Sequence, residues 1–368
     1  MSITISIPRE RKPGETRVAA TPSLVSKLVK AGAKIGIETA AGSKSSFSDE
    51  DYISAGASIH QSLEETWNNA ELLLKVKEPA PEELDLMRPG LSVFSFLHPA
   101  AAIPMTAALL KHKVLGLDFD LVREADGSLP ILAPMSEIAG RLAVYAAAEH
   151  LMSSHKGLGL LLSGTSTSQS ARVCVIGAGV SGAAAAALAA ANGADVSLLD
   201  INEKRLEQLA NQKAFENVKL LPSTTDSILE CCTRSEVVIG AVLIPGEKAP
   251  KLLKTSMLPK MQKGSILIDI CIDQGGFAES SKTTSIEKPT YIEAGVSHYC
   301  VPNMPGLVPL TATTSLSNAL EPYLLKIAKH GIEGALVESK ALAESLITRN
   351  GKLTHPAVKN SIGSEFDQ

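Results

Sequence analysis

The sequence lacks the marks of several large protein classes. It has no surplus of positive charge, because 35 basic and 39 acidic residues leave a net charge of -4. Proteins that bind nucleic acid or a membrane surface usually carry a basic patch. The most apolar stretch, the alanine-rich run after Ser181, is too short to cross a bilayer, and the N-terminus does not have the order of a secretory signal. We therefore expect a cytoplasmic protein with neither nucleic acid nor membrane as a partner.

Cysteine is also scarce. The chain has five, they are scattered and odd in number, and none has the paired spacing of a zinc site. They are Cys174, Cys231, Cys232, Cys271 and Cys300. This pattern indicates a reduced compartment, apolar packing roles for the thiols and no metal site.

Strand and helix patterns alternate through the first third of the chain. With 368 residues, 45% of them hydrophobic, the chain is long enough for two domains with cores of their own. Strand-length apolar runs occur at Ile3–Ile7, Ala33–Glu38, Glu71–Val76, Leu91–Leu97 and Val114–Leu117. Helical periodicity occurs at Ser23–Ala31 and Pro104–His112. This alternation predicts an α/β fold with a largely parallel sheet covered on both faces.

A second α/β unit is predicted from Ala171 to about Met304. Before it, Ser136–His155 reads as one long helix that Ser136 can cap. After it, a long helical pattern covers roughly Thr313–His330. The tail beyond is too small for a domain, so we expect it to pack on structure already formed.

The second unit opens with a dinucleotide-binding pattern. A buried strand, Val173–Ile176, leads into Gly177-Ala-Gly179-Val-Ser-Gly182 and an alanine-rich helix, and the next strand ends in Asp200. The three glycines permit a tight turn, a close approach to a pyrophosphate and close helix packing, while the helix N-terminus favours the anion. Asp200 can bind both ribose hydroxyls and would repel a 2′-phosphate, which favours NAD over NADP, although the nearby Arg205 leaves some NADP use open. The alternative is a turn with no ligand.

Several blocks resemble the alanine dehydrogenase family in the same order and over nearly the whole chain. They are Pro8-Arg-Glu, Glu15-Thr-Arg17, Leu74-Lys75-Val-Lys-Glu-Pro79, Phe96-Leu-His98, Pro134-Met-Ser136-Glu-Ile-Ala-Gly-Arg141, Ala241-Val-Leu-Ile-Pro-Gly246, Asp273-Gln-Gly-Gly276 and Pro302-Asn-Met-Pro305. The resemblance implies a homo-oligomer, usually a hexamer. It also implies that the chain is an oxidoreductase that interconverts L-alanine with pyruvate and ammonium, using NAD.

The resemblance assigns roles to four ionisable residues. Arg17 matches the residue that holds the substrate carboxylate, a task that suits the planar fork of arginine. Lys75 matches the residue that contacts substrate and polarises the oxo group. His98, at the end of a strand, is the expected general acid/base. Asp273, after the strand Ser265–Ile270, is the second catalytic group. Without the family, each has a structural interpretation as a salt bridge, a solvated strand end, a loop residue or a turn former.

The remaining site residues are expected around the cofactor. Ser136 could donate to the pyrophosphate, Asn303 and Met304 match a loop that closes over cofactor and substrate, and Asn303 is also expected to contact substrate. The cofactor-binding set is Ser136, Gly177, Ala178, Gly179, Val180, Gly182, Asp200, Arg205, Val242, Leu243, Ile270, Asp273 and Met304. One departure from the family lies near His98, where Asp120 stands at the position of a longer glutamate.

The family also suggests how the chain divides. Residues 1–132 and 307–368 would form a substrate domain, residues 133–306 a Rossmann-type NAD domain, and a cleft would separate them. Two other functions remain open: the NAD-binding α-subunit of a proton-translocating transhydrogenase, and a non-catalytic NAD-binding regulator. The presence of both His98 and Asp273 argues against the first. Alanine as against glycine or another small amino acid, and the physiological direction, also remain open.

Overall fold

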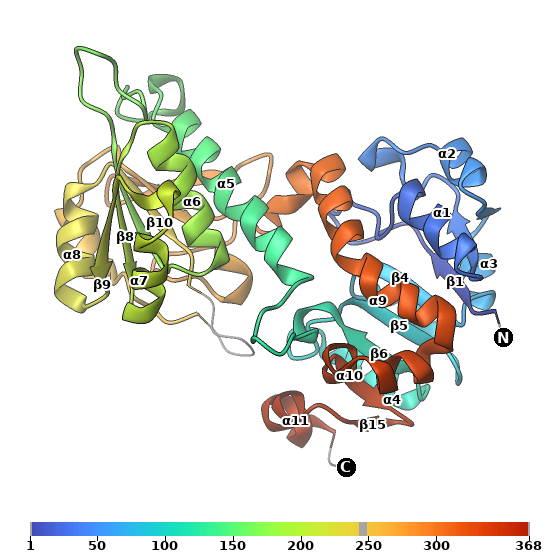
Figure 1. Ribbon diagram of the computed structural model, residues 1–368. Helices are drawn as coiled ribbons and strands as arrows, with labels where there is room; N and C mark the ends of the chain where they lie inside the picture. The colour runs from blue at the N-terminus through green and yellow to red at the C-terminus, as the bar shows by residue number, and fades with distance from the viewer. Residues whose placement is uncertain (1, 243–248, 367–368) are drawn as a thin grey trace. The chain divides into compact units, whose positions relative to one another are not determined.

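The computed structural model describes residues 2–242 and 249–366, and its class is mixed α/β, as predicted (Figure 1). The chain divides into two compact units. The first consists of Met1–Met135 and Gly306–Gln368, and the second of Ser136–Pro305. Each unit is built on its own sheet.

The described part of the first unit forms an eight-stranded sheet in the order β15-β14-β6-β5-β4-β1-β2-β3. The strands are β1 (Thr4–Ile7), β2 (Lys34–Glu38), β3 (Ser58–His60), β4 (Leu72–Lys77), β5 (Ser92–Phe96), β6 (Leu115–Asp118), β14 (Leu346–Arg349) and β15 (Lys352–Leu353). The strands β1 to β6 pair in parallel, whereas β14 and β15 pair antiparallel at one edge. Strand β4 is buried from Leu72 to Val76, which is expected for a strand covered on both faces.

Helices of very different lengths accompany this sheet. They are α1 (Pro22–Lys30), α2 (Asp49–Ser54), α3 (Leu63–Asn68), α4 (Ile103–Lys111), α9 (Pro309–Glu338), α10 (Lys340–Glu344) and α11 (Pro356–Ile362). Helix α1 begins where the hydroxyl of Thr21 accepts the N–H of Leu24, with Pro22 at the first helical position. The C-terminal segment returns to this sheet, where β14 pairs with β6 and β15 pairs with β14 (Figure 1).

The described part of the second unit forms a seven-stranded sheet in the order β12-β13-β11-β10-β7-β8-β9. The strands are β7 (Arg172–Ile176), β8 (Asp195–Asp200), β9 (Val218–Pro222), β10 (Val237–Gly240), β11 (Ile266–Asp269), β12 (Thr290–Glu293) and β13 (Val296–Tyr299). The helices are α5 (Leu132–His150, which starts at the end of the first unit), α6 (Val180–Ala191), α7 (Glu203–Ala210) and α8 (Thr225–Arg234). Alternate residues of β7 serve two cores, because Val173 and Val175 pack in one hydrophobic cluster and Cys174 and Ile176 in another.

The structure confirms the predicted strands to within about two residues and corrects one helix. Helix α5 begins at Leu132 and ends at His150 instead of covering Ser136–His155. Ser136 therefore lies inside the helix and cannot cap it. Pro134 obscured the start in the sequence, but proline is tolerated in the first turn, where its missing N–H has no helical partner.

Candidate active site

The dinucleotide motif has the geometry that its glycines suggested. Gly177 has a φ of 101°, and a Cβ there would lie 2.5 Å from the carbonyl oxygen of Ala241. A Cβ on Gly182 would lie 1.7 Å from the oxygen of Gly177, so α6 can approach the turn only with glycine at that position. A Cβ on Gly179 would meet no atom within 4 Å. The open space at Gly179, in front of the first turn of α6, is where a pyrophosphate fits.

Asp200 is held at the end of β8 by two backbone amides. Its Oδ2 accepts the N–H of Ala178 at 2.6 Å and its Oδ1 accepts the N–H of Asn202 at 2.7 Å. Each carboxylate oxygen has a second lone pair, so both oxygens can still accept a ribose hydroxyl. Arg205 donates from Nε to the carbonyl of Ala178 at 3.0 Å, which fixes its guanidinium beside the same turn. The donors and acceptors around this turn therefore fit NAD.

The flank of the motif is formed by α5 and α6. The carbonyl of Ser136 accepts the hydroxyl of Ser181 at 2.8 Å, and a Cβ on Gly140 would lie 2.0 Å from the oxygen of Ser181. These contacts bring Ser136 to the first turn of α6. Val180, the first residue of α6, is 44% exposed.

The other expected cofactor residues occupy strand ends and the loops that follow. Val242 is half-buried and donates its N–H to Sγ of Cys271 at 3.0 Å, and Ile270 is half-buried after β11. Met304 is buried in the core of the second unit, and its contact with the cofactor stays a prediction. Leu243 lies outside the described residues.

Asp273 and Asn303 lie together in the second unit. Asp273 is exposed on the short helix η7 (Ile272–Gln274), and its Oδ2 accepts the N–H of Asn303 at 3.2 Å. Asn303 has a φ of 53°, a conformation that asparagine tolerates better than most residues. The loop before Asn303 is thereby tied to the acid.

Asp269, which the sequence analysis did not single out, shapes the loop that carries Asp273. It is buried, and its carboxylate accepts the N–H of Cys271 and of Phe277 at 2.9 Å each, as well as the hydroxyl of Ser281. Burial raises the pKa of Asp269. In the sequence, the only sign of this residue was an acid at the end of a short apolar run that was predicted to be a strand.

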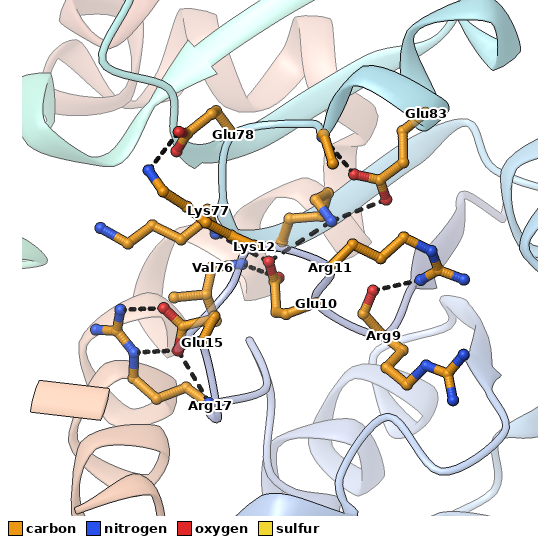
Figure 2. Close-up of polar contacts among 12 residues, drawn as sticks. Arg9, Glu10, Arg11, Lys12, Glu15, Arg17, Val76, Lys77, Glu78 and Glu83 are labelled. Carbon is orange, nitrogen blue, oxygen red and sulfur yellow. Dashed lines mark hydrogen bonds and ion pairs between the residues drawn. The ribbon is translucent and has the colours of Figure 1, made fainter. Parts of the chain in front are cut away.

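In the first unit, Arg17 is buried and forms a two-pronged ion pair with the buried Glu15 (Figure 2). Its Nε and Nη2 donate to the two Glu15 oxygens at 2.7 and 2.6 Å, and its Nη1 contacts Sδ of Met135 at 3.1 Å. Burial alone would raise the pKa of Glu15, but its hydrogen bonds to Arg17 and the arginine charge outweigh burial and lower it to about 2. Glu15 thus fixes one edge of the guanidinium.

Lys75 lies on β4 between two carboxylates. Its Nζ donates to Glu83 at 3.0 Å and lies 3.5 Å from Glu10. Glu83 belongs to the short helix η2 (Pro81–Leu86), where it also accepts the N–H of Ala80. Burial disfavours the charged amine, but the two carboxylates outweigh burial and raise the pKa of Lys75, so it is a fixed cation at neutral pH.

His98 follows β5 and is half-buried. Its Nδ1 lies 3.0 Å from Oδ2 of Asp120, and its ring stacks on Phe96 with centroids 6.1 Å apart. Burial lowers the pKa of His98, but the hydrogen bond and charge of Asp120 outweigh burial and raise it. A φ of 44° at His98 shows that the backbone is strained where the ring is presented. With Nδ1–H directed to Asp120, Nε2 is the atom that can accept a proton.

Each of the three predicted residues of the first unit is thus held by one or more acids, of which the sequence analysis had singled out only Asp120. Glu10 and Glu83 flank Lys75, and Glu15 holds Arg17. Asp118 lies beneath Asp120, and burial followed by the Asp120 charge raises the pKa of Asp118 to about 7. Lys77 lies near the histidine, because its Nζ is 6.0 Å from the centroid of the Phe96 ring on which His98 stacks.

A chain that combines a Rossmann-type unit with a second α/β unit carrying buried cations and an acid-paired histidine has the features of a nucleotide-dependent enzyme of the dehydrogenase class. The family description "Alanine dehydrogenase/PNT, N-terminal domain" matches residues 6–139, and "Alanine dehydrogenase/PNT, C-terminal domain" matches residues 143–356. The chain belongs to the alanine dehydrogenase/PNT family.

Relatives and solved structures cover almost the whole chain. Alanine dehydrogenase of Geobacillus stearothermophilus is 44% identical over 96% of this chain and 95% of its own length. A solved L-alanine dehydrogenase superposes with a TM-score of 0.93 at 41% identity, covering 98% of this chain and 99% of that one. A solved transhydrogenase from Sinorhizobium meliloti gives 0.81 at 25% identity, covering 96% and 99%. The similarity is therefore greater on the alanine dehydrogenase side of the family.

Proposed function

We propose that this protein is an NAD-dependent alanine dehydrogenase that oxidatively deaminates L-alanine to pyruvate and ammonium, and catalyses the reverse reductive amination. The observation that carries the proposal is the 44% identity to an alanine dehydrogenase over nearly the full length of both chains. It is supported by an arginine, a lysine and a histidine in the first unit, each of which is paired with an acid. The lower identity of 25% to the transhydrogenase structure makes the transhydrogenase alternative less well supported.

Three residues of the first unit act on the substrate in this proposal. Arg17 binds the substrate carboxylate, with Glu15 holding its guanidinium in one orientation. Lys75 directs its charge at the oxo oxygen of pyruvate. His98 accepts a proton at Nε2 from the amine of alanine, or from the water that attacks the imine, while Asp120 stabilises the imidazolium.

The second unit binds the cofactor. The turn at Gly177, Gly179 and Gly182 would hold the pyrophosphate, and Asp200 the adenine-side ribose. When bound, NAD supplies the acceptor for the hydride that leaves the α-carbon. Asp273 would stabilise the cationic imine and orient the water that adds to it, and Asn303 is positioned with it through their hydrogen bond.

This assignment gives each part of the chain a role. Residues 1–132 with 307–368 would bind the amino or oxo acid, and residues 133–306 would bind NAD. We further infer a homo-oligomer, expected to be a hexamer, and a cytoplasmic location, for which the free state of all five cysteines in the described part of the chain is the support. In residues 2–242 and 249–366, no helix meets the length and apolarity that a membrane crossing needs.

A direct assay tests the proposal. Purified protein should consume NADH when pyruvate and ammonium are supplied together, and should reduce NAD with L-alanine. Glyoxylate in place of pyruvate tests the substrate, and NADPH in place of NADH tests the cofactor. A protein that binds NADH but turns over neither pyruvate nor glyoxylate would be a regulator instead of an enzyme. Light scattering of the purified protein tests the oligomeric state.

A further inference from the structure

Five ionisable side chains, Lys75 among them, form one buried group, and their charges do not balance. Glu10, Glu15 and Glu83 are carboxylates, Lys75 and Arg17 are cations, and no side chain in the group is more than 4% exposed. With every group ionised, the group carries one net negative charge. An uncompensated buried charge is costly, so a proton held by one carboxyl stabilises the group.

Contacts single out Glu10 as the carboxyl that can most readily take up such a proton. Glu15 has two hydrogen bonds from Arg17, and Glu83 has a direct hydrogen bond from Lys75 at 3.0 Å. Glu10 is 3.5 Å from the Lys75 amine, and its other partners are the neutral backbone N–H groups of Val76 and Lys77 (Figure 2). Burial is the largest influence on Glu10, and it raises the pKa of that carboxyl to about 7.

Two cations outside the buried group act mainly on its other members, since Lys77 lowers the pKa of Glu15 and Arg11 lowers that of Lys75. Glu15 and Glu83 both raise the pKa of Glu10, and Lys75 lowers it. Lys77 is half-buried at the rim, and Arg11 is committed to Glu38 through two hydrogen bonds.

A small cavity gives Glu10 a route for proton exchange. The cavity has a volume of about 20 Å³, and its lining includes Glu10, Glu15 and Arg17 as well as the exposed residues Arg9 and Lys44. That volume accommodates one water molecule among several polar partners. A proton can therefore pass between solvent and Glu10 without any large movement of the chain.

We propose that Glu10 takes up a proton when the anionic 2-oxo acid binds. The substrate carboxylate brings a further negative charge to Arg17 and Lys75, and protonation of Glu10 compensates for it. Neutral Glu10 leaves the Lys75 charge directed at the substrate, whereas ionised Glu10 draws it back. Glu10 acts through Lys75, so it is a positioning residue. The inference rests on the proposed function, because it takes a 2-oxo acid as the ligand.

Calorimetric titration of the NADH-loaded enzyme with oxamate, an unreactive pyruvate analogue, tests this proposal. Measured in two buffers of different ionisation enthalpy at about pH 8, wild-type enzyme should take up most of one proton per oxamate bound. Oxamate affinity should fall roughly five- to tenfold per pH unit above about pH 8, the slope that uptake of nearly one proton requires. Glu10→Gln imitates the protonated form and keeps an acceptor for the Val76 N–H. It should lose this uptake and the corresponding part of the pH dependence, and any part that remains belongs to His98.

Glu82→Gln is the matched control. Glu82 is exposed and adjoins Glu83, so its substitution changes the net charge equally without altering the buried group, and its proton uptake should equal that of wild type. If Glu10→Gln takes up as many protons as wild type, the proposal is wrong.

A second measurement needs no variant. The infrared difference spectrum of wild-type enzyme on oxamate binding should gain a carboxylic acid C=O band at the expense of a carboxylate band, and its absence would refute the proposal. Turnover of pyruvate separates the two levels of inference. Normal turnover with unchanged uptake in Glu10→Gln contradicts only the role of Glu10, whereas absence of both turnover and oxamate binding contradicts the proposed function as well.

Discussion

Oδ2 of Asp120 lies 3.0 Å from Nδ1 of His98, and this contact determines which nitrogen of the ring can exchange a proton with substrate. The second oxygen of Asp120, Oδ1, is buried and has no hydrogen-bond partner among the described residues. Asp118, also buried, lies on the same turn and accepts the N–H of Asp120. The histidine therefore contacts Asp120, and Asp120 is in turn hydrogen-bonded to Asp118, whose pKa burial raises to about 7.

Replacing His98 by alanine should lower kcat by about 10²- to 10⁴-fold, the usual contribution of a general acid/base. Asp273→Asn should likewise abolish most of the turnover while NADH binding stays nearly intact. Stopped-flow turnover and fluorescence titration with NADH measure the two quantities separately. A near-normal rate in either variant would show that its residue has no catalytic role.

Asp120→Asn should change the pH dependence of alanine oxidation. Because Asp120 raises the pKa of His98, the variant histidine loses its proton at a lower pH. The base required for oxidation is then available in more acidic solution, so the acidic limb of the kcat/KM profile should move to lower pH. The measurement is kcat/KM for L-alanine against pH in both proteins, and a limb that stays in place or moves to higher pH would contradict the assignment.

Arg17→Met should destabilise the protein by about 3–5 kcal/mol, since it removes the cation that forms a buried ion pair with the Glu15 carboxylate. The double variant Arg17→Met/Glu15→Gln removes that charge and should recover most of the loss without recovering substrate binding. Urea denaturation gives the free energies of unfolding, and KM for pyruvate gives the binding effect. If the double variant were no more stable than the single one, Glu15 would not be the main partner of Arg17.

Much of the fold could be predicted because its signals are local. Strand-length apolar runs and the glycine motif were enough for β1, β2, β4 to β8 and α6. Strands β14 and β15 were missed, because β14 exists by pairing with β6 far away in the sequence. Pro134 hid the start of α5.

The site was predictable in its residues but not in its charge balance. The resemblance identified Arg17, Lys75 and His98, together with Asp120 beside the histidine, but gave no role to the acids that hold Arg17 and Lys75. Glu10 reaches Lys75 only because β1 pairs with β4, which brings the segment after β1 beside the end of β4. A contact between positions about 65 residues apart leaves no periodic signal in a single sequence.

Asp200→Ser should weaken NADH binding by roughly 10- to 100-fold, as expected for loss of hydrogen bonds to a charged group. It should also relax discrimination against NADPH, because the repulsion of a 2′-phosphate is removed. Arg205 is fixed beside the same turn and offers a cation to that phosphate. The ratio of kcat/KM for the two cofactors measures the effect, and Arg205→Ala added to Asp200→Ser should reverse the gain with NADPH. An unchanged ratio in Asp200→Ser would show that Asp200 does not read the ribose.

Two glycines of the cofactor turn should respond differently to the same added methyl group. Gly182→Ala places a Cβ 1.7 Å from the oxygen of Gly177, so α6 must shift and the protein itself should lose about 1–3 kcal/mol or more of stability. Gly179→Ala adds a Cβ that meets no atom within 4 Å, and φ at this position is −64°, which suits alanine. Thermal unfolding without cofactor should therefore be unchanged in Gly179→Ala, while its affinity for NADH falls at least about tenfold, because the methyl occupies the space proposed for the pyrophosphate. Normal NADH binding by Gly179→Ala would place the phosphates elsewhere and remove the basis for assigning the cofactor to this turn.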